Sequence, residues 1–181
     1  ATKGKTSSAE SWVLNGGVAT VESYCGGTFD PNFFDVVVGD HPRHVEAMKA
    51  ASLQTRNGPF TAVHAGLDPR VPADGQTRET LLWIRDPFLR HVDPRFGPVI
   101  HGHTPVGKRP VVTENRISLD TGAYDTGILS CLALGGDGSL RFAAATPKGA
   151  TGVEPVALDR GHGTLLDRPK APRWPPPARR T

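Results

Sequence analysis

Two short apolar runs that each end in histidine constrain the fold of this chain more than any other feature. Residues 61–63 (TAV) lead into residues 64–66 (HAG), and residues 98–100 (PVI) lead into residues 101–105 (HGHTP). Short apolar runs bounded by turn residues are typical of buried strands. Rigid sheets often present functional side chains at strand ends, and glycine allows backbone and ligand to approach closely. The two runs therefore predict buried strands whose terminal histidines are candidate functional residues.

The rest of the chain changes from helical to strand-like signals near its middle. A helical stretch from Ser8 is expected to break at Asn15-Gly16-Gly17, and a helix over residues 42–52 has Pro42 in its first turn. An Asn57-Gly58 turn is expected to join two strands. Strands are predicted over residues 52–56, 60–64, 98–101, 116–120, 128–134 and 140–145, and a short helix over residues 79–84. We therefore expect the α+β class, with helices in the N-terminal part and strands in the remainder.

The composition limits the partners of the chain. Its 181 residues suffice for one domain of ordinary size. No apolar stretch approaches the ~18 residues that a membrane span requires, and the opening sequence ATKGKTSSAE lacks the apolar region of a secretory signal. A cytoplasmic protein without membrane contact is therefore expected. The tail from Arg168 holds five basic residues and no acid, so the rest of the chain is close to neutral and nucleic acid is not an expected partner.

The expected domain boundary follows from the loss of periodicity near the end of the chain. Apolar alternation fades past Lys148, and the remainder is rich in proline and basic residues. Residues 1–147 are predicted to belong to one folded domain, and residues 148–181 are predicted to form a disordered tail. Cys25 and Cys131 lie far apart and in no CxxC arrangement, which favours two free thiols over a disulfide.

His64 and His103 form a candidate metal site. Neutral imidazole is a common ligand of Zn, Fe and Mn ions, so two such histidines could supply two ligands to one ion. Divalent ions that handle phosphate also require carboxylate oxygens, and two-metal hydrolysis requires a group that bridges ions ~3.5–4 Å apart. The alternative interpretation is a pair of ordinary loop histidines held by hydrogen bonds, because a chain with seven histidines offers many such pairs. The spacing alone leaves both interpretations open.

Four segments carry a specific combination of motifs. They are VHAGL (63–67), LLWIRDPFL (81–89), VIHGHTPV (99–106) and NRISLDTGAYDTGILSCLAL (115–134). In order and spacing they resemble the bacterial serine/threonine protein phosphatases of the calcineurin-like metallophosphoesterase superfamily, and the segment from Trp12 to Tyr24 resembles the one that follows that family's third motif. The resemblance implies an αββα layered sandwich, of which residues 1–147 would form the C-terminal portion, mostly the C-terminal sheet with N-terminal helices. It also implies hydrolysis of phosphate monoesters by a hydroxide that bridges two divalent metal ions (Mn, Fe or Zn).

The resemblance assigns roles to three residues of these motifs. His64 and His103 would be the histidine ligands of the second metal ion. Arg85 would bind the phosphoryl group of the substrate, since a guanidinium forms paired hydrogen bonds with phosphate oxygens. The alternative for Arg85 is a surface ion pair with Asp86 or Glu79.

Four neighbouring residues are expected to have supporting roles. His101 is expected to orient its neighbours rather than bind the metal. Tyr124 either lines the cleft or packs in the interior, and Trp83 is expected to pack in the core. Asp120 is a carboxylate beside the metal site, but capping of the turn over residues 121–123 is the favoured interpretation.

Three earlier motifs of the family, GDxHG, GDxxDRG and GNHE, do not occur in the chain. Gly39-Asp40-His41 lacks the intervening residue of the first motif and lies in the wrong place for it. Those motifs supply the ligands of the first ion, the bridging aspartate and the general acid, so the chain alone is expected to bind metal incompletely and to have little or no activity. The missing N-terminal half is thus an expected partner, and a phosphorylated protein or a small phosphoester is the expected substrate.

Two alternative functions remain. A dinucleoside tetraphosphatase-like hydrolase shares the logic of the superfamily, although LLWIR followed by HGHTPV fits protein phosphatases better. The other alternative is a non-catalytic binding module, in which the segment Trp174-Pro175-Pro176-Pro177 would dock on a partner as a polyproline helix.

Overall fold

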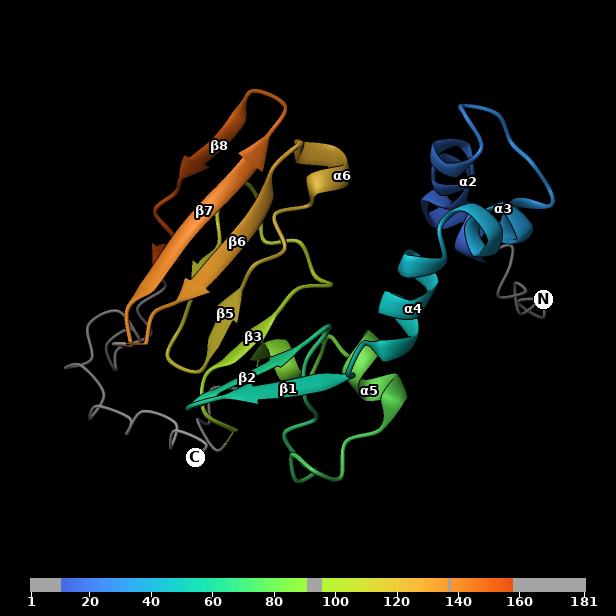
Figure 1. The fold of residues 1–181 in the computed structure, drawn as a ribbon. Helices are drawn as coiled ribbons and strands as arrows, with labels where there is room; N and C mark the ends of the chain where they lie inside the picture. Colours follow the sequence, from blue (N-terminus) through green and yellow to red (C-terminus); the bar gives the residue numbers. More distant parts are fainter. Residues whose placement is uncertain (1–10, 91–95, 137, 158–181) are drawn as a thin grey trace, which may run out of the picture. The chain divides into compact units, whose positions relative to one another are not determined.

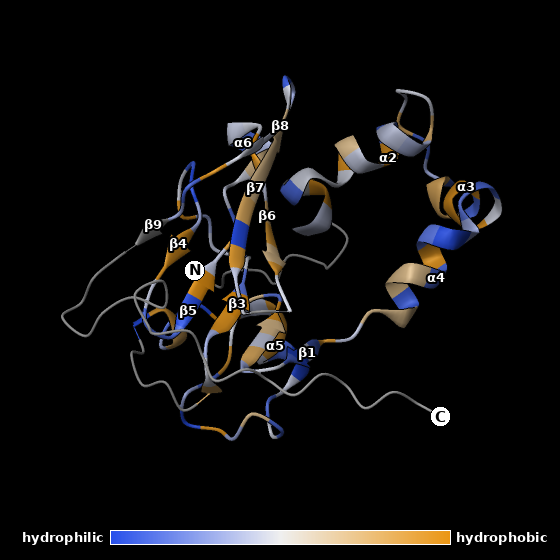
Figure 2. Cartoon of the chain, turned by 60° about the vertical axis from the view of Figure 1, so that its left-hand side comes forward, coloured by the Kyte–Doolittle hydropathy of each residue, from blue (hydrophilic) through white to orange (hydrophobic). Residues whose placement is uncertain are grey.

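The structure is a computed structural model that describes residues 11–90, 96–136 and 138–157. It contains a six-stranded sheet, a three-stranded sheet and several short helices, which confirms the α+β class (Figure 1). Hydrophobic residues are concentrated in short strands such as β3 (Val99–His101) and β4 (Val111–Val112) (Figure 2). Among the helices of the described residues, none combines the length and the hydrophobicity that a membrane span requires.

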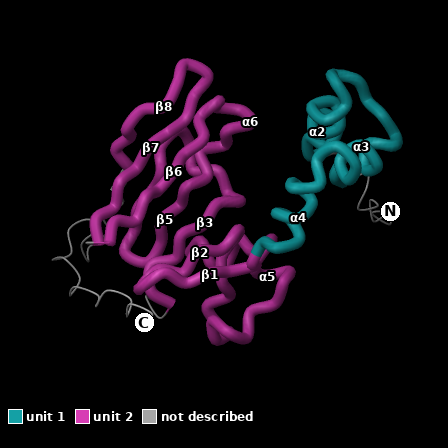
Figure 3. The backbone as a smooth tube through the Cα atoms, viewed as in Figure 1, with its two compact units in different colours: residues 1–51 teal, residues 52–181 magenta. Residues whose placement is uncertain are grey.

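The chain divides into two compact units, residues 1–51 and residues 52–181 (Figure 3). The first unit consists of short helices with the bounds η1 Val13–Gly17, α2 Val18–Tyr24, α3 Phe33–Asp40 and α4 Pro42–Ala50. The expected break is present, because Gly16 takes a positive φ of 94° that glycine adopts without steric cost. The helix predicted from Pro42 is confirmed as α4, whereas α3 was not predicted, since its three consecutive valines disfavour a helix locally. Its helix is stabilised instead by burial of Phe33 and Val37 against Val21.

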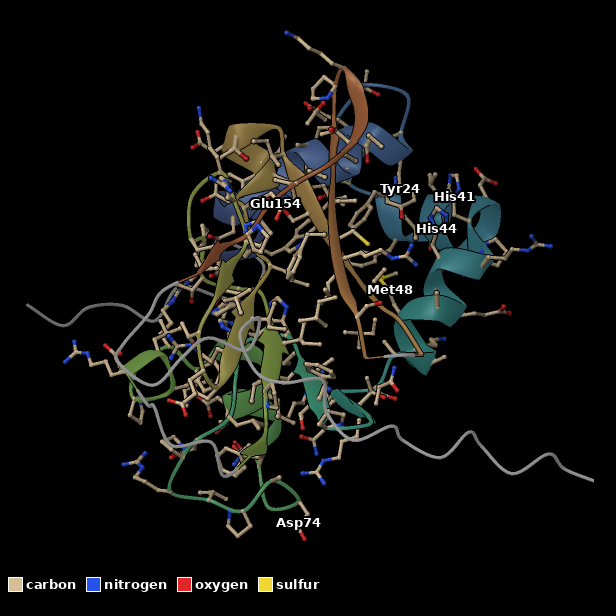
Figure 4. All side chains as sticks on the ribbon, turned by 90° about the vertical axis from the view of Figure 1, so that its left-hand side faces the viewer. Tyr24, His41, His44, Met48, Asp74 and Glu154 are labelled. Atoms are coloured by element: carbon tan, nitrogen blue, oxygen red, sulfur yellow. The ribbon has the colours of Figure 1, made fainter. Side chains whose placement is uncertain are left out.

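Tyr24 packs against two histidines of the first unit (Figure 4). Its hydroxyl lies 2.8 Å from Nδ1 of His44. The tyrosine ring lies edge-on to both imidazoles, with centroid distances of 5.0 Å to His41 and 5.7 Å to His44. The two imidazoles stack with their centroids 5.2 Å apart. These contacts join the end of α2 to the start of α4.

The larger sheet of the second unit is mixed, with the strand order β1-β2-β3-β5-β4-β9. Its remaining strands are β1 Gln54–Asn57, β2 Phe60–Val63, β5 Arg116–Ser118 and β9 Val156–Ala157. β1 and β2 pair antiparallel, and Gly58 takes a φ of 58° between them, so the predicted Asn57-Gly58 turn is confirmed. β2, β3 and β5 run parallel to one another. Their carboxyl ends therefore meet at one edge of the sheet.

The smaller sheet is antiparallel in the order β6-β7-β8. Its strands are β6 Leu129–Leu134, β7 Leu140–Thr146 and β8 Gly149–Gly152, and the second unit also contains α5 Arg78–Trp83, η2 Phe88–Arg90 and α6 Ala123–Thr126. The hydroxyl of Thr77 accepts a hydrogen bond of 3.1 Å from the backbone N–H of Thr80, which caps the start of α5. The helix predicted over residues 79–84 is thus confirmed within one residue.

An apolar cluster packs residues of β2 and β3 against residues of α5 and η2. It comprises Val63, Leu67, Leu81, Phe88 and Val99. The backbone N–H of Ala65, directly after β2, donates a hydrogen bond of 2.9 Å to the carbonyl of Leu81 in α5. The turn that carries His64 and the helix that precedes Arg85 are therefore held together by both packing and a backbone hydrogen bond.

The structure differs from the sequence-based boundaries in two places. The division after Ala51 was not predicted, since no proline- or glycine-rich linker marks it in the sequence. Residues 149–157 were assigned to a disordered tail, but they include β8 and β9. β8 begins and ends in glycine and therefore lacks the apolar alternation of a strand; it forms because its backbone pairs with β7. Residues 158–181, the rest of the predicted tail, lie outside the described residues. Cys25 and Cys131 are free thiols, as expected.

Candidate functional site

The parallel pairing of β2 and β3 brings His64 and His103 together. Ala62 lies in register with Ile100, so each histidine follows the carboxyl end of its strand. Beyond the strands, the backbone N–H of Gly102 donates a hydrogen bond of 2.9 Å to the carbonyl of His64. The two imidazole rings consequently have their centroids 5.0 Å apart, with an angle of 59° between their planes.

His103 has an unusual backbone conformation. Its φ of 65° is the only positive value for a non-glycine residue in the described part of the chain. The backbone N–H of Thr104 donates a hydrogen bond of 2.7 Å to the carbonyl of Gly102, so His103 is the central residue of a tight turn. Such a conformation costs on the order of 1–3 kcal/mol and persists only where surrounding contacts enforce it, which is common at functional sites.

The surroundings of His103 lower the pKa of its side chain. Partial burial is the largest cause, and the nearby side chains of Arg85 and His64 lower the pKa further. A backbone hydrogen bond with Trp83 acts in the opposite direction. Metal-ligating histidines commonly make a backbone hydrogen bond of this kind with one ring nitrogen, which orients the other nitrogen for the ion.

The distance between the two imidazoles fits a shared metal ion. Two imidazole ligands at about 2.0–2.1 Å from a tetrahedral ion have ring centroids about 5 Å apart, and the observed separation of His64 and His103 is 5.0 Å. Within residues 11–90, 96–136 and 138–157, however, no group of three or more His, Cys, Asp or Glu side chains could hold a metal ion. Among the described residues, His64 and His103 are therefore not part of a larger group of metal-binding side chains.

Two carboxylates near these histidines in the sequence have structural partners. Asp68 forms two hydrogen bonds with the Arg70 guanidinium, at 2.9 and 2.7 Å, and these bonds hold its pKa at about 2. Oδ1 of Asp120 accepts a hydrogen bond of 2.9 Å from the backbone N–H of Gly122. That bond closes the turn at residues 121–123, as the capping interpretation of Asp120 predicted.

His101 lies beneath the site and uses both ring nitrogens within the protein. It is only 2% exposed. Nδ1 lies 3.0 Å from the carbonyl of Gly102, so Nδ1 donates, and the other nitrogen, Nε2, accepts from the Ser118 hydroxyl at 2.8 Å. Burial lowers the pKa of His101 to about 4, which keeps the ring neutral. His101 is therefore hydrogen-bonded to the residue before His103 and to β5, and its supporting role at a metal site stays a prediction.

No protein-family model, curated protein or solved structure matches the chain. The interpretation of the site therefore depends on the geometry of its own residues.

Arg85 lies beside this turn. Its Nη1 donates a hydrogen bond of 3.0 Å to the hydroxyl of Thr104, the residue after His103. Within the described part of the chain, the ion pair of Asp86 is with Arg90, at 3.1 Å, and not with Arg85. The exposed guanidinium therefore has an orienting partner on the histidine turn and keeps further N–H groups for an anion. Thr104 was not singled out from the sequence.

Arg116 anchors the loop that follows Arg85. This residue of β5 is buried, and its Nη1 donates hydrogen bonds of 3.0 and 2.6 Å to the carbonyls of Phe88 and Leu89. Its guanidinium also lies 5.6 Å from the centroid of the Phe88 ring. Sequence analysis missed this role, because β5 (Arg-Ile-Ser) contains one apolar residue and nothing local marks its arginine as buried.

Two aromatic residues of the site are more exposed than expected. Trp83 was expected to pack in the core, but its side chain is 68% exposed, because α5 buries Leu81 instead. The indole contacts the edge of the site, with its centroid 5.6 Å from that of His103 at an angle of 89°. Tyr124, in α6, is 89% exposed, so interior packing does not explain it.

Gly66 allows Phe88 to pack against the histidine turn. A Cβ atom at residue 66 would lie 2.2 Å from Cδ1 of Phe88. We expect the Gly66→Ala substitution to lower the free energy of unfolding by about 1–3 kcal/mol, because a buried ring must move. Urea unfolding should show this as a lower midpoint. Gly136→Ala is the matched control, since a Cβ there meets nothing within 4 Å; equal midpoints for the two variants would contradict the close approach.

Proposed function

We propose that this chain carries the histidine and arginine side of a metal-dependent phosphoesterase centre, of the serine/threonine protein phosphatase type within the metallophosphoesterase superfamily. One observation carries the proposal. The imidazoles of His64 and His103 lie 5.0 Å apart, and Arg85 is hydrogen-bonded to Thr104, the next residue after His103. Two ligands for a cation and a donor for an anion thus converge on one turn, which is the combination that a phosphate bound to a metal requires.

Different residues would bind the metal ion and the phosphoryl group. His64 and His103 would hold one divalent ion of the Mn, Fe or Zn type, which supplies Lewis-acid chemistry when bound. Arg85 would orient the phosphoryl group with its remaining N–H groups and stabilise the negative charge that develops on the phosphoryl oxygens. Thr104 accepts a hydrogen bond from the guanidinium of Arg85, and His101 donates one to Gly102, in the turn that carries His103.

The proposal assigns the carboxylate side of the centre to another polypeptide segment. The described residues offer no carboxylate in reach of both histidines, and hard divalent ions require such oxygen ligands. We therefore assign the second unit to the C-terminal portion of an αββα sandwich. The chain alone would then hydrolyse phosphate monoesters slowly or not at all, and its substrates would be a phosphorylated protein or a small phosphoester.

The metal-binding step can be tested without activity. We expect Zn²⁺ to shift the ring C–H signals of His64 and His103 together in a titration followed by NMR. Loss of a residue that only supports a metal ligand typically weakens metal affinity by about 10–100-fold. Loss of one of two ligands should weaken the affinity at least as much. His103→Ala should therefore weaken the Zn²⁺ response of His64 by about tenfold or more.

The first unit provides the matched control for this titration. His44→Ala removes one member of the other histidine pair, whose centroids are 5.2 Å apart, and should leave the response of His64 unchanged. A response of His64 that survives His103→Ala would show that the two residues share no ion. Ordinary rates of p-nitrophenyl phosphate hydrolysis with Mn²⁺, lost on His103→Ala, would contradict the assignment of the carboxylates to another segment.

A further inference from the structure

The first unit contains a second pair of close histidines, in the same region as the only methionine of the chain (Figure 4). His41 occupies the N-cap position of α4, and His44 and Met48 follow within the helix. Positions four apart lie on the same face of a helix, so His44 and Met48 are neighbours on the surface of α4. Both are exposed and His41 is half-buried, so a small ligand can reach all three side chains.

The two imidazoles are spaced like two ligands of one ion. Their ring centroids lie 5.2 Å apart. Two imidazoles that bind one ion at about 2.0–2.1 Å have ring centroids about 5 Å apart. The planes of the rings are 20° from parallel, and the outer torsion of a histidine side chain rotates easily. Rotation of the His41 ring can therefore direct one of its nitrogens toward an ion held by His44.

Tyr24 orients the imidazole of His44. The tyrosine hydroxyl lies 2.8 Å from Nδ1 of His44. When Nδ1–H donates to the phenol oxygen, Nε2 keeps its lone pair for a ligand. A hydrogen bond on the second ring nitrogen fixes the tautomer and the orientation of metal-ligating histidines. The ring of Tyr24 also lies edge-on to His41, with centroids 5.0 Å apart, so one side chain positions both imidazoles.

We propose that His41, His44 and Met48 form a binding site for Cu(I). A thioether is a soft, polarizable ligand that favours Cu(I), and imidazole also suits copper. Zn²⁺ is bound by imidazole, thiolate and carboxylate, so it gains little from the thioether of Met48. The site lies wholly within the first unit, and the inference is independent of the proposed phosphoesterase function.

The single methionine provides a direct test on the full chain. A chain labelled with ¹³C at the methionine methyl group gives one signal, that of Met48. Cys25 and Cys131 are free thiols that would also bind Cu(I), so the titration uses the Cys25→Ala/Cys131→Ser chain. Under anaerobic conditions, with ascorbate to keep copper reduced, we expect Cu(I) to shift the methyl signal together with the ring C–H signals of His41 and His44. Zn²⁺ is expected to leave the methyl signal in place.

Variants of exposed residues measure the contribution of each ligand. In the same cysteine-free chain, competition with the chelator bicinchoninate gives the affinity for Cu(I). Met48→Leu should weaken it about tenfold or more and leave the affinity for Zn²⁺ unchanged, since loss of even a supporting residue costs about 10–100-fold. His44→Ala should weaken the affinity for Cu(I) at least as much. Lys49→Ala is the matched control, because Lys49 is an exposed neighbour on a different face of α4 and its loss should change neither affinity.

Three results would overturn the inference. The first is a Met48 methyl signal that does not respond to Cu(I). The second is an affinity for Cu(I) that survives Met48→Leu or His44→Ala. The third is a methyl shift with Zn²⁺ as large as that with Cu(I), which would show that the thioether does not select a soft ion.

Discussion

Acidification from about pH 6.5 to about pH 4 is expected to remove about 3 kcal/mol from the free energy of unfolding of the second unit through His101 alone. Burial lowers the pKa of this imidazole from 6.5 to about 4 in the folded protein. The unfolded chain therefore takes up a proton over a pH range in which the folded protein does not. The stabilisation is complete above pH 6.5, is lost progressively as the pH falls, and stops changing below about pH 4, where both states are protonated.

The measurement is the free energy of unfolding as a function of pH, with hydrogen exchange of the β3 and β5 amides as the reporter. His101→Gln should flatten the curve over this range, because glutamine does not titrate. It should also lower the stability at neutral pH, because the contacts with Ser118 and Gly102 are altered. His64→Gln is the control for the substitution itself, since it replaces an exposed histidine of the same unit. An unchanged slope in His101→Gln would show that the buried imidazole does not cause the pH dependence of the free energy of unfolding.

Replacing Arg116 by methionine is expected to lower the free energy of unfolding of the second unit by about 3–5 kcal/mol. Two hydrogen bonds from a charged donor to the carbonyls of Phe88 and Leu89 are lost, and each such bond contributes about 1.5–3 kcal/mol. Methionine fills a similar volume but cannot donate, so the carbonyl of Phe88 would lose this donor. The contact of the guanidinium with the Phe88 ring is lost as well.

Chemical denaturation of the full chain, again followed through the β3 and β5 amides, measures this effect. Arg141→Met is the matched control, because Arg141 is exposed in β7 and its loss should change stability by no more than about 0.5 kcal/mol. If Arg116→Met proves as mild as the control, the guanidinium does not hold the loop. If the loop at Phe88 and Leu89 is no longer held, Arg85 just before it should also lose its fixed position. Inorganic phosphate binding is therefore expected to weaken in parallel with stability.

The elements that were predicted correctly are those with a local cause. The hairpin of β1 and β2 follows from Asn57-Gly58, where a tight turn needs residues that tolerate positive φ. The helix α4 follows from Pro42 and the helix formers after it. α3 and β8 were missed for the opposite reason: the valines of α3 oppose a helix locally, and the glycines of β8 carry no strand pattern. Their conformations depend on packing and on pairing with β7.

In the candidate site, too, features with a local cause were predicted and features that depend on distant contacts were not. His64, His101 and His103 were singled out because turns and glycines mark the ends of apolar runs, whereas Arg85 was singled out through the family resemblance of the segment LLWIR. The roles of Thr104, Ser118 and Arg116 required the structure, since each acts through a hydrogen bond to a residue at least 17 positions away in the chain. The exposure of Trp83 also required it, because the sequence does not show which side of α5 faces the apolar cluster.

The two histidines at strand ends illustrate what each level of description determines. The sequence alone determined that His64 and His103 follow apolar strands and are flanked by small residues, because strand periodicity and turn formation depend on neighbouring residues. Only the tertiary structure decided that their rings lie 5.0 Å apart. That distance results from the parallel register of β2 with β3 and from the Gly102 to His64 backbone hydrogen bond. Both are contacts between segments distant in the chain, and their formation depends on the balance of burial and pairing over the whole second unit.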